Sequence, residues 1–482
     1  MVVFGASGDL TARKLIPALE ELAANGQLPS AFGLVGVART EMSDDDFRRR
    51  VSEAVVEPSP AWESIVTGFR YVTGEYGEAA TFERLGDVLR ELDRERGTSG
   101  NRLYYLATVP TVFATIAAAL GEHGLSRPPT DGAFVRVVVE KPFGHDLASA
   151  QELDAQLHTV FDEEQIYRID HYLGKETVQN VLALRFANSI FEPIWNRRYV
   201  DHVQITVAES LGVGHRGGFY EQAGAMRDIV QNHVLQVLAL TLMEPPATID
   251  AQGIRDEKVK ALRAVDVLGT DEVAANVIRG QYDDGWVEGT PVPAYRHEEG
   301  VARDSRTETY VAMRVTVDNW RWAGVPFYVR TGKRLPKRVT EVAMTFHAVP
   351  HLPFAAGHAR GLDRNALVLR IQPDEGVTLR FGAKVPGQAF RVRTVSMDFS
   401  YGAAFLEETP DAYERLLLDA MVGDPTLFIR TDEVEQAWRI VQPLLAAWAN
   451  DDAPLSHYPA GSWGPKEADG LLEREGRTWR KP

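Results

Sequence analysis

Short β-branched runs alternate with helix-period segments through the first half of the chain, and this order of segments constrains the fold more than any other feature. Apolar residues between the runs recur at helical spacing. Strand–helix alternation of this kind predicts a parallel sheet with helices on both faces and right-handed crossings, so we expect an N-terminal doubly wound α/β domain. Strands are predicted at Val2–Phe4, Gly33–Ala38, Arg102–Ala107, Val135–Glu140 and Gln165–Ile169.

The pattern changes after Lys175. Helices are predicted at Glu176–Phe186 and Met226–Leu242, and at Ala412–Met421 and Glu433–Ala447 near the C-terminus. Strands that follow one another without helices indicate a second, α+β domain with a large, mainly antiparallel sheet. The domains are expected to span residues 1–172 and 173–482, with flexibility at Asp283–Ser305 and in the final residues. The predicted strands of the second domain are Tyr310–Val317, Phe327–Arg330, Val342–Phe346, Ala366–Ile371, Thr378–Phe381 and Phe390–Met397.

The composition excludes several classes of function. The 482 residues include no cysteine, which excludes disulfides, thiolate nucleophiles and cysteine-bound metals. The formal charge of −16 argues against nucleic acid as a partner, because phosphate backbones need a basic face. No stretch approaches the roughly 20 apolar residues of a membrane-spanning helix, and the N-terminus carries no secretion signal. We expect a cytoplasmic protein without a membrane partner.

A glycine-rich turn joins the first predicted strand to a helix. Its residues are Gly5, Ala6, Ser7, Gly8, Asp9 and Leu10. Glycines allow positive φ and a close backbone approach, and the following helix N-terminus offers free N–H groups, so the turn suits a dinucleotide pyrophosphate. The spacing is G-x-x-G and not the G-x-G-x-x-G fingerprint, which leaves an ordinary strand–helix connection as the alternative.

Arg39 follows the second predicted strand, where NAD-specific folds usually carry an acidic residue. A guanidinium at this point pairs with a ribose 2′-phosphate and favours NADP. Glu41 lies close by and keeps NAD open as a weaker alternative. A solvated loop arginine is the other interpretation of Arg39.

The segment from Asp170 to Glu176 combines a histidine and a lysine four residues apart, His171 and Lys175. If both lie in a helix, their side chains share one face beside the helix N-terminus and form an anion site, to which Tyr172 adds a hydroxyl donor. A phosphate is the expected occupant. A surface helix that begins with Asp170 as its N-cap is the alternative.

Two further sets of cations could meet an anion. Lys141 follows a predicted strand, and Pro142 restricts its backbone to an extended conformation that suits a side chain reaching the carboxyl ends of the strands. Arg330–Arg338 is a basic segment in an acidic chain. It is either a solvated face or a local charge that draws an anionic substrate toward the site.

His233 lies in the predicted helix Met226–Leu242, whose apolar face carries Ile229 and Val234. A histidine in a helix is usually structural. It could also be a general base near neutral pH if a carboxylate holds its tautomer, and Asp170 is the candidate carboxylate. We expect no metal site, because Pro350 prevents a regular helix through His347 and His351 and no HExxH motif occurs.

Taken together, these motifs resemble the glucose-6-phosphate dehydrogenase family along almost the whole chain. The resemblance implies a Rossmann-like domain that binds NADP and oxidation of glucose 6-phosphate to 6-phospho-D-glucono-1,5-lactone, the first step of the oxidative pentose phosphate pathway. It also implies a homodimer or homotetramer. It rests on Gly5–Leu10, Glu140-Lys141-Pro142-Phe143-Gly144, Arg168–Glu176, Arg227–His233, Arg330-Thr331-Gly332-Lys333, Tyr413–Leu417 and Gly461-Ser462-Trp463-Gly464-Pro465.

The resemblance assigns a role to each candidate residue. His233 matches the family's general base and Asp170 the carboxylate that orients it. The other matches are His171, Lys175 and Tyr172 for the phosphate, Lys141 between substrate and cofactor, Glu209, Asp228 and Lys333 for the sugar, Arg338 where many relatives have lysine, and Arg39 for the 2′-phosphate. The second domain, residues 173–482, is thereby expected to bind the substrate and to form the oligomer.

Two other functions remain open from the sequence alone. One is a related sugar or sugar-phosphate dehydrogenase that shares the Glu-Lys-Pro motif. The other is a non-catalytic protein that binds NADP.

The first predicted strand, Val2–Phe4, is shorter than a typical strand of about 5–6 residues. Members of the family that the chain resembles usually begin earlier than this sequence does.

Overall fold

The structure is a computed structural model that describes residues 1–354, 362–387, 390–405, 410–449 and 453–482. The chain divides into two compact units. Unit 1 contains residues 1–175, 247–255 and 410–435, and unit 2 contains residues 176–246, 256–409 and 436–482. No helix of the described residues combines the length and the apolar character needed to cross a membrane.

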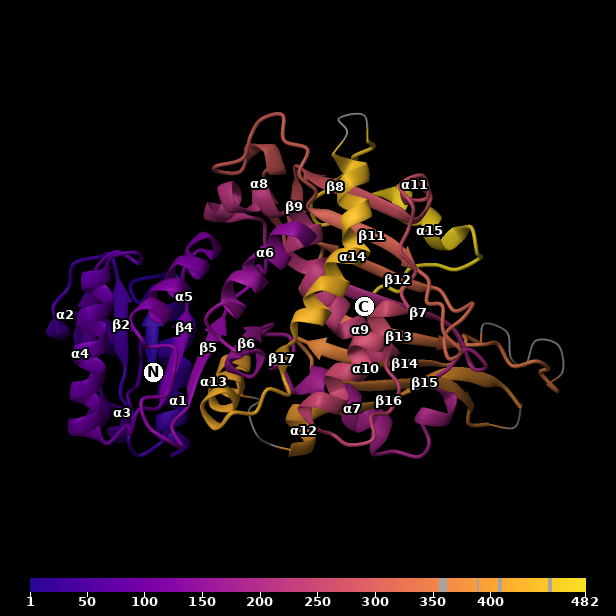
Figure 1. The fold of residues 1–482 in the computed structure, drawn as a ribbon. Helices are drawn as coiled ribbons and strands as arrows, with labels where there is room; N and C mark the ends of the chain where they lie inside the picture. Colours follow the sequence, from indigo (N-terminus) through magenta and orange to yellow (C-terminus); the bar gives the residue numbers. More distant parts are fainter. Residues whose placement is uncertain (355–361, 388–389, 406–409, 450–452) are drawn as a thin grey trace. The chain divides into compact units, whose positions relative to one another are not determined.

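Unit 1 is built on a seven-stranded sheet (Figure 1). Six strands are parallel, in the order β3-β2-β1-β4-β5-β6, which is the order of dinucleotide-binding doubly wound folds. The short strand β17 (Phe428–Ile429) extends the sheet antiparallel to β6. The parallel strands are β1 (Val2–Phe4), β2 (Val35–Ala38), β3 (Arg70–Thr73), β4 (Arg102–Leu106), β5 (Val135–Val139) and β6 (Ile166–Ile169).

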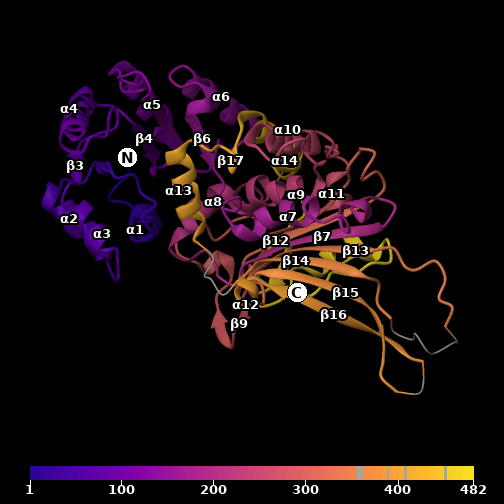
Figure 2. The same ribbon diagram turned by 90° about the horizontal axis from the view of Figure 1, so that it is seen from below.

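Helices cover both faces of this sheet. Helices α4, α5 and α6 pack on one another, as do α1, α3 and α13, and Figure 2 shows the two groups on opposite sides of the strands. The alternation of strands and helices in the sequence therefore predicted the layers correctly. The helices of unit 1 are α1 (Ile16–Ala24), α2 (Asp44–Glu53), α3 (Pro60–Val66), α4 (Ala79–Arg96), α5 (Phe113–Glu122), α6 (Leu147–His158) and α13 (Ala412–Val422), and the π-helix η1 (Thr11–Leu15) precedes α1.

The described residues of unit 2 form a nine-stranded, mainly antiparallel sheet in the order β16-β15-β14-β13-β7-β12-β11-β8-β18. Only the pairs β7–β12 and β8–β18 are parallel. The predicted fold class is confirmed in both units. The strands are β7 (Val200–Ala208), β8 (Val277–Asp283), β11 (Tyr310–Val315), β12 (Phe327–Gly332), β13 (Val339–Phe346), β14 (Ala366–Gln372), β15 (Gly376–Lys384), β16 (Val392–Ser400) and β18 (Ser456–Pro459), and a separate hairpin joins β9 (Gly285–Val287) to β10 (Thr290–Val292).

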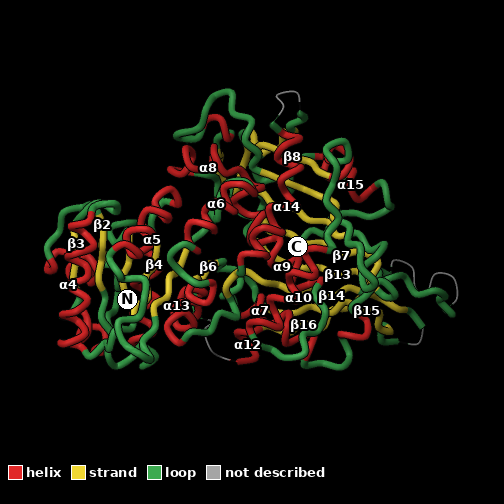
Figure 3. The backbone as a smooth tube through the Cα atoms, in the orientation of Figure 1, coloured by secondary structure: helices red, strands yellow, loops and turns green. Residues whose placement is uncertain are grey.

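Helices α7 and α9, red in Figure 3, pack together beside the yellow strands of this sheet. The predicted helix Met226–Leu242 is instead a π-helix, η6 (Met226–Val234), that continues into α9. The division into units falls inside α10 and α14. The remaining helices are α7 (Glu176–Phe186), α8 (Gly217–Ala225), α9 (Leu235–Leu242), α10 (Ala251–Arg263), α11 (Val273–Asn276), α12 (Tyr401–Phe405), α14 (Thr431–Trp448) and α15 (Gly470–Glu473).

The final residues, for which the sequence predicts flexibility, are bonded across the central strands of unit 2. The backbone N–H of Arg480 donates to Gln204 on β7, and its side chain donates to Glu341 on β13 at 2.8 Å. Trp479 is buried. The C-terminal segment therefore packs against the sheet, and its backbone and the Arg480 guanidinium supply hydrogen-bond partners to polar side chains of β7 and β13. The segment Asp283–Ser305 likewise contains β9, β10 and the buried Tyr295.

Asp93 and Arg102 tie the end of α4 to the start of β4. Arg102 donates to both carboxylate oxygens of Asp93, at 3.0 and 2.5 Å. Burial alone would raise the pKa of Asp93, but the hydrogen bonds from Arg102, Thr98 and the backbone of Gly100 outweigh it and lower the pKa to about 2. The ionised form of Asp93 is therefore more stable in the folded than in the unfolded protein.

We expect Asp93→Asn to destabilise the protein at neutral pH, by an amount that shrinks as the pH falls from about 4 toward 2. A lowered pKa contributes stability above the unfolded value, about 3.9, and loses it as the folded carboxylate is protonated. Denaturant midpoints at pH 7, 5 and 3 measure the effect. Asp87→Asn is the matched control, because Asp87 lies in the same helix and pairs with Arg90 at the surface. A pH-independent effect of Asp93→Asn contradicts the prediction.

Candidate active site

The glycine-rich turn leaves β1 at the carboxyl edge of the parallel sheet. Gly5 has a φ of +86°, and a Cβ on it would lie 2.4 Å from the carbonyl oxygen of Ala107, just beyond β4. The N–H of Gly5 donates to Val37 and that of Gly8 donates to Gly5, each at 2.9 Å. Only glycine fits this backbone, and its position between β1 and β4 is where the strand order reverses. The turn and the helix that follows it therefore fit a dinucleotide pyrophosphate.

The end of β2 brings polar groups to the same turn. Thr40 donates to the hydroxyl of Ser7 at 3.1 Å, and Arg39 beside it is exposed. Arg50 of α2 donates to the backbone oxygen of Ser7 at 2.7 Å. Arg50 was missed by the sequence analysis, although it ends a visible run of three arginines. A second guanidinium beside this edge adds to the positive charge there.

Lys141 follows β5 and is half-buried, and its peptide bond to Pro142 is cis. The preceding residue, Glu140, is buried and accepts a hydrogen bond from Tyr105 at 2.5 Å and another from Tyr413 of α13. Burial raises the pKa of Glu140, while the hydrogen bonds and Lys141 act in the opposite direction. These contacts hold the backbone that carries Lys141.

The segment after β6 is a series of turns and not the helix that the sequence analysis considered. The backbone N–H of Tyr172 donates to the carboxylate of Asp170 at 2.9 Å, and the backbone N–H of Lys175 donates to the backbone carbonyl oxygen of Tyr172 at 3.1 Å. Helix α7 begins only at Glu176, so His171 and Lys175 are not brought together by helical spacing. Asp170 is buried and is therefore not the N-cap of a surface helix.

Tyr172 contacts the side chains of both His171 and Lys175. The Lys175 Nζ lies 4.2 Å from the centre of the Tyr172 ring, and the His171 ring centre lies 5.3 Å from it. His171 also stacks on Tyr413, with ring centres 6.3 Å apart. Turn geometry and aromatic contacts thus bring a histidine and a lysine together with two tyrosine rings just after β6, and the histidine and lysine suit an anion.

A second cluster braces β6 just before this segment. Asp154, His158 and Glu163 have side-chain ligand atoms within 4.8 Å of one another. Arg168 of β6 is buried and pairs with Asp154 at 2.6 Å and with Glu163 at 2.8 Å. Thr431 donates to the same oxygen of Asp154. Arg168 therefore holds both carboxylates of this cluster in buried ion pairs.

Three of the predicted sugar-binding residues meet in unit 2. The Lys333 Nζ lies 2.6 Å from a Glu209 carboxylate oxygen and 3.9 Å from one of Asp228. Glu209 follows β7 and Lys333 follows β12, and these parallel strands end in register, with Ala208 opposite Gly332. Parallel pairing therefore brings together two residues 124 positions apart. Donors and acceptors of this kind are suited to sugar hydroxyls.

His233 lies in the π-helix η6 together with Asp228 and is 1% exposed. It belongs to unit 2, whereas Asp170 belongs to unit 1. The pairing of these two side chains stays a prediction.

The basic segment Arg330–Arg338 is not one solvated face. Arg330 is buried, with its guanidinium 4.6 Å from the ring of Trp479, and Arg334 pairs with Glu298 at 3.2 Å. Arg338 is exposed and donates to Gln372 at 3.2 Å. The segment therefore divides into cations that stabilise unit 2 and cations that reach solvent.

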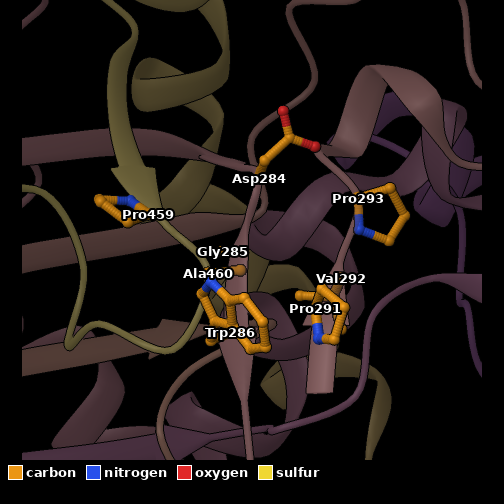
Figure 4. Close-up of a pocket in the computed structure, with 8 residues that line it drawn as sticks. All are labelled: Asp284, Gly285, Trp286, Pro291, Val292, Pro293, Pro459 and Ala460. Atoms are coloured by element: carbon orange, nitrogen blue, oxygen red, sulfur yellow. The ribbon is translucent and has the colours of Figure 1, made fainter. Parts of the chain in front are cut away.

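A cavity of about 690 Å³ lies beside the β9–β10 hairpin (Figure 4). It is lined by Trp286, Asp284 and several prolines, and Trp286 is 67% exposed. None of the predicted site residues lines it. It is therefore separate from the groups described above.

A doubly wound sheet with a glycine turn at its switch point, together with a second unit built on a large, mainly antiparallel sheet, is typical of oxidoreductases that use NAD or NADP. Two family profiles match the chain: "Glucose-6-phosphate dehydrogenase, NAD binding domain" over residues 2–180 and "Glucose-6-phosphate dehydrogenase, C-terminal domain" over residues 182–480. The protein belongs to the glucose-6-phosphate dehydrogenase family.

Individual relatives agree along the full length. Glucose-6-phosphate 1-dehydrogenase 2 of Mycobacterium tuberculosis is 51% identical, covering 100% of this chain and 94% of the relative. Glucose-6-phosphate 1-dehydrogenase of Aggregatibacter actinomycetemcomitans is 50% identical, with 100% and 97% covered. A solved structure of glucose-6-phosphate dehydrogenase in complex with its substrate glucose-6-phosphate has a TM-score of 0.91 at 36% identity, with 100% of this chain and 98% of that chain covered. The enzyme from Mycobacterium avium has a TM-score of 0.83 at 38% identity, with the same coverage.

We expect Gly5→Ala to weaken NAD(P) binding by at least about tenfold, because the new Cβ displaces either the turn or the end of β4. Calorimetry or fluorescence titration with the dinucleotide measures the dissociation constant. Gly26→Ala is the matched control, since Gly26 also has a positive φ, +65°, but no atom within 4 Å of a built Cβ. Equal dissociation constants for the two variants contradict the role of the turn.

Proposed function

We propose that the protein oxidises D-glucose 6-phosphate at C1 to 6-phospho-D-glucono-1,5-lactone with NADP as the oxidant, the first step of the oxidative pentose phosphate pathway. The observation that carries this proposal is the match along the full length to glucose-6-phosphate 1-dehydrogenases at about half identity. The cluster of Lys333, Glu209 and Asp228 agrees with it, because it offers hydrogen-bonding groups to a sugar.

The reaction needs one base. His233 takes the proton of the C1 hydroxyl as the hydride leaves C1, and Asp170 orients its ring and stabilises the imidazolium that forms. The bound nicotinamide supplies the chemistry of hydride acceptance. A buried imidazole suits this role, because its proton transfers are shielded from bulk water.

The phosphate is remote from the reacting carbon and supplies binding energy that holds C1 in place. His171 and Lys175 bind it, and Tyr172 assists through its hydroxyl. Glu209, Asp228 and Lys333 bind the sugar hydroxyls. Arg338, in the loop after β12, is exposed and adds positive charge for the phosphorylated substrate. It matches a position where many relatives have lysine.

The cofactor is bound by residues 5–10 and by Lys141, within a dinucleotide-binding domain of residues 1–172. Arg39 contacts the 2′-phosphate, and Arg50 adds positive charge to the same edge, so NADP is preferred and NAD is a weaker alternative. Residues 173–482 form the substrate-binding and oligomerisation domain.

The protein acts in the cytoplasm as a homodimer or homotetramer. One of the two edge strands of the large sheet, β16, exposes Val395, Met397 and Phe399. An exposed apolar strand at a sheet edge favours association with a second copy.

We expect His233→Asn to lower kcat by about 10²–10⁴-fold while the Michaelis constant for glucose 6-phosphate changes little, because the variant loses the base and keeps the substrate contacts. NADPH absorbance on mixing the protein with NADP and glucose 6-phosphate measures the rate. His215→Asn, at an exposed histidine of unit 2, is the control. Near-normal turnover of His233→Asn at saturation would remove the base assignment, and turnover of glucose as fast as of its phosphate would favour another sugar dehydrogenase.

We expect Arg39→Ala to raise the Michaelis constant for NADP about tenfold and to leave that for NAD within about twofold, because only NADP carries the 2′-phosphate. Steady-state kinetics with both cofactors gives the two ratios. Arg49→Ala, at an exposed arginine of α2 paired with Asp46, is the control. Equal effects on NADP and NAD would reassign Arg39 to the solvated loop.

A further inference from the structure

The helix that carries Asp228 and His233 begins at a break in the chain. Gly224, the residue before the last of α8, has a φ of 64° and a ψ of 174°, which is not helical. A new helix therefore starts at this point, and its first N–H groups need acceptors from elsewhere, because no preceding turn supplies them. The sequence suggests one continuous helix from Met226 and gives no sign of how its start is satisfied.

Glu308 supplies two of these acceptors. Its backbone oxygen accepts from Ala225 N–H at 2.9 Å, and its Oε1 accepts from Met226 N–H at 3.0 Å. Glu308 is distant in sequence and stands just before β11, whose first residue is Tyr310. It is buried, with 6% of its surface exposed. A carboxylate at a helix N-terminus is favourable for both hydrogen bonding and the helix dipole.

Gly224 fits closely against the same carboxylate. A Cβ on this glycine would lie 2.3 Å from Oε1 of Glu308 and 2.8 Å from Oε2. The positive φ and the close approach together permit only glycine. The break and the carboxylate therefore form one fitted arrangement that fixes where η6 starts.

The π-helical form of η6 makes its starting point and pitch important for the site. A π-helix bonds each residue to the one five positions on, as an α-helix bonds residues four apart, so residues five apart lie on the same side of the helix. Asp228 and His233 are five apart. In an α-helix, with about 3.6 residues per turn, the same two side chains would point in clearly different directions. From this geometry we infer that the π-helix places Asp228 and His233 on the same side of η6.

We propose that Glu308 is a positioning residue for the reaction: by capping η6 it sets the register that presents His233 and Asp228 to the substrate. This inference rests on the proposed function, because it takes His233 as the base and Asp228 as a sugar ligand. Glu308 itself need not touch the substrate. It acts through the backbone of Ala225 and Met226.

Several charged or titratable groups act on the Glu308 carboxylate from neighbouring elements. Burial raises its pKa, and the bonds from Met226 and its own backbone and the cations Arg227 and Arg279 act in the opposite direction. Tyr220 of α8 is buried close to it, with its own pKa raised by burial and by Asp228, Glu308 and Glu209. Because the capping bond needs an acceptor and not a charge, a glutamine at this position can still make it.

Three variants test the proposal. Glu308→Leu fills the space without an acceptor, Glu308→Asp withdraws the carboxylate from Met226, and Glu308→Gln keeps an acceptor of the same reach. We expect Glu308→Leu to lower kcat at least about tenfold and to raise the Michaelis constant for glucose 6-phosphate, with that for NADP within about twofold. Glu308→Asp should show a smaller loss of the same kind. Glu308→Gln should retain kcat within about threefold, which is the rescue that a positioning role requires.

Glu341→Leu is the matched control, because Glu341 is a buried carboxylate of β13 paired with Arg480. It should lower the melting temperature without changing kcat or either Michaelis constant. Wild-type kcat in Glu308→Leu overturns the inference, as does an equal loss in Glu341→Leu. If Glu308→Leu does not fold, wild-type kinetics in Glu308→Asp overturns it. Normal kcat in Glu308→Leu beside an inactive His233→Asn rejects the inference alone, whereas an active His233→Asn rejects the proposed function.

Discussion

Parallel strands point their carboxyl ends to one edge of a sheet, so the side chains that follow them meet there even when they are far apart in the chain. Both units depend on this constraint. In unit 1 it gathers Gly5, Arg39, Lys141 and Asp170 at the ends of four strands. In unit 2 it works through a single parallel pair, β7 and β12, inside a sheet that is otherwise mainly antiparallel. Each unit uses backbone pairing to place charged side chains that local sequence could not bring together.

The charged groups so placed are partly withdrawn from water, which strengthens their interactions and makes each one depend on a partner. Lys333 is balanced by Glu209 and Asp228, and its ammonium also lies 5.0 Å from the ring centre of Tyr220. Arg168 is balanced by two carboxylates below the segment that carries Asp170. Such pairs add little net stability but hold side chains in one geometry, which is the property that a binding site needs.

Regular patterns in the sequence predicted regular structure well. Five of the six parallel strands of unit 1 were predicted from short β-branched runs, and the predicted bounds of α7 were also correct. The central strand β7 was missed, although Val203, Ile205 and Val207 alternate with His202, Gln204 and Thr206 as in a half-buried strand. Three of those residues, His202, Gln204 and Thr206, are nevertheless buried, and Gln204 is bonded to the C-terminal segment. A residue covered by a distant segment cannot be distinguished from an exposed one by local pattern.

Local chemistry in the sequence determined the glycine turn, the cations near it and the family to which the chain belongs, because those depend on residue types at short spacing. Tertiary structure alone decided three features. These are the contact of Lys333 with Glu209, the turns in place of a helix at His171, and the π-helix that carries His233 and whose first N–H groups donate to Glu308. Two of them depend on hydrogen bonds between residues that are remote in sequence, and the turns at His171 depend on a local backbone conformation that competes closely with a regular helix. A periodic pattern of apolar residues reveals neither kind of interaction.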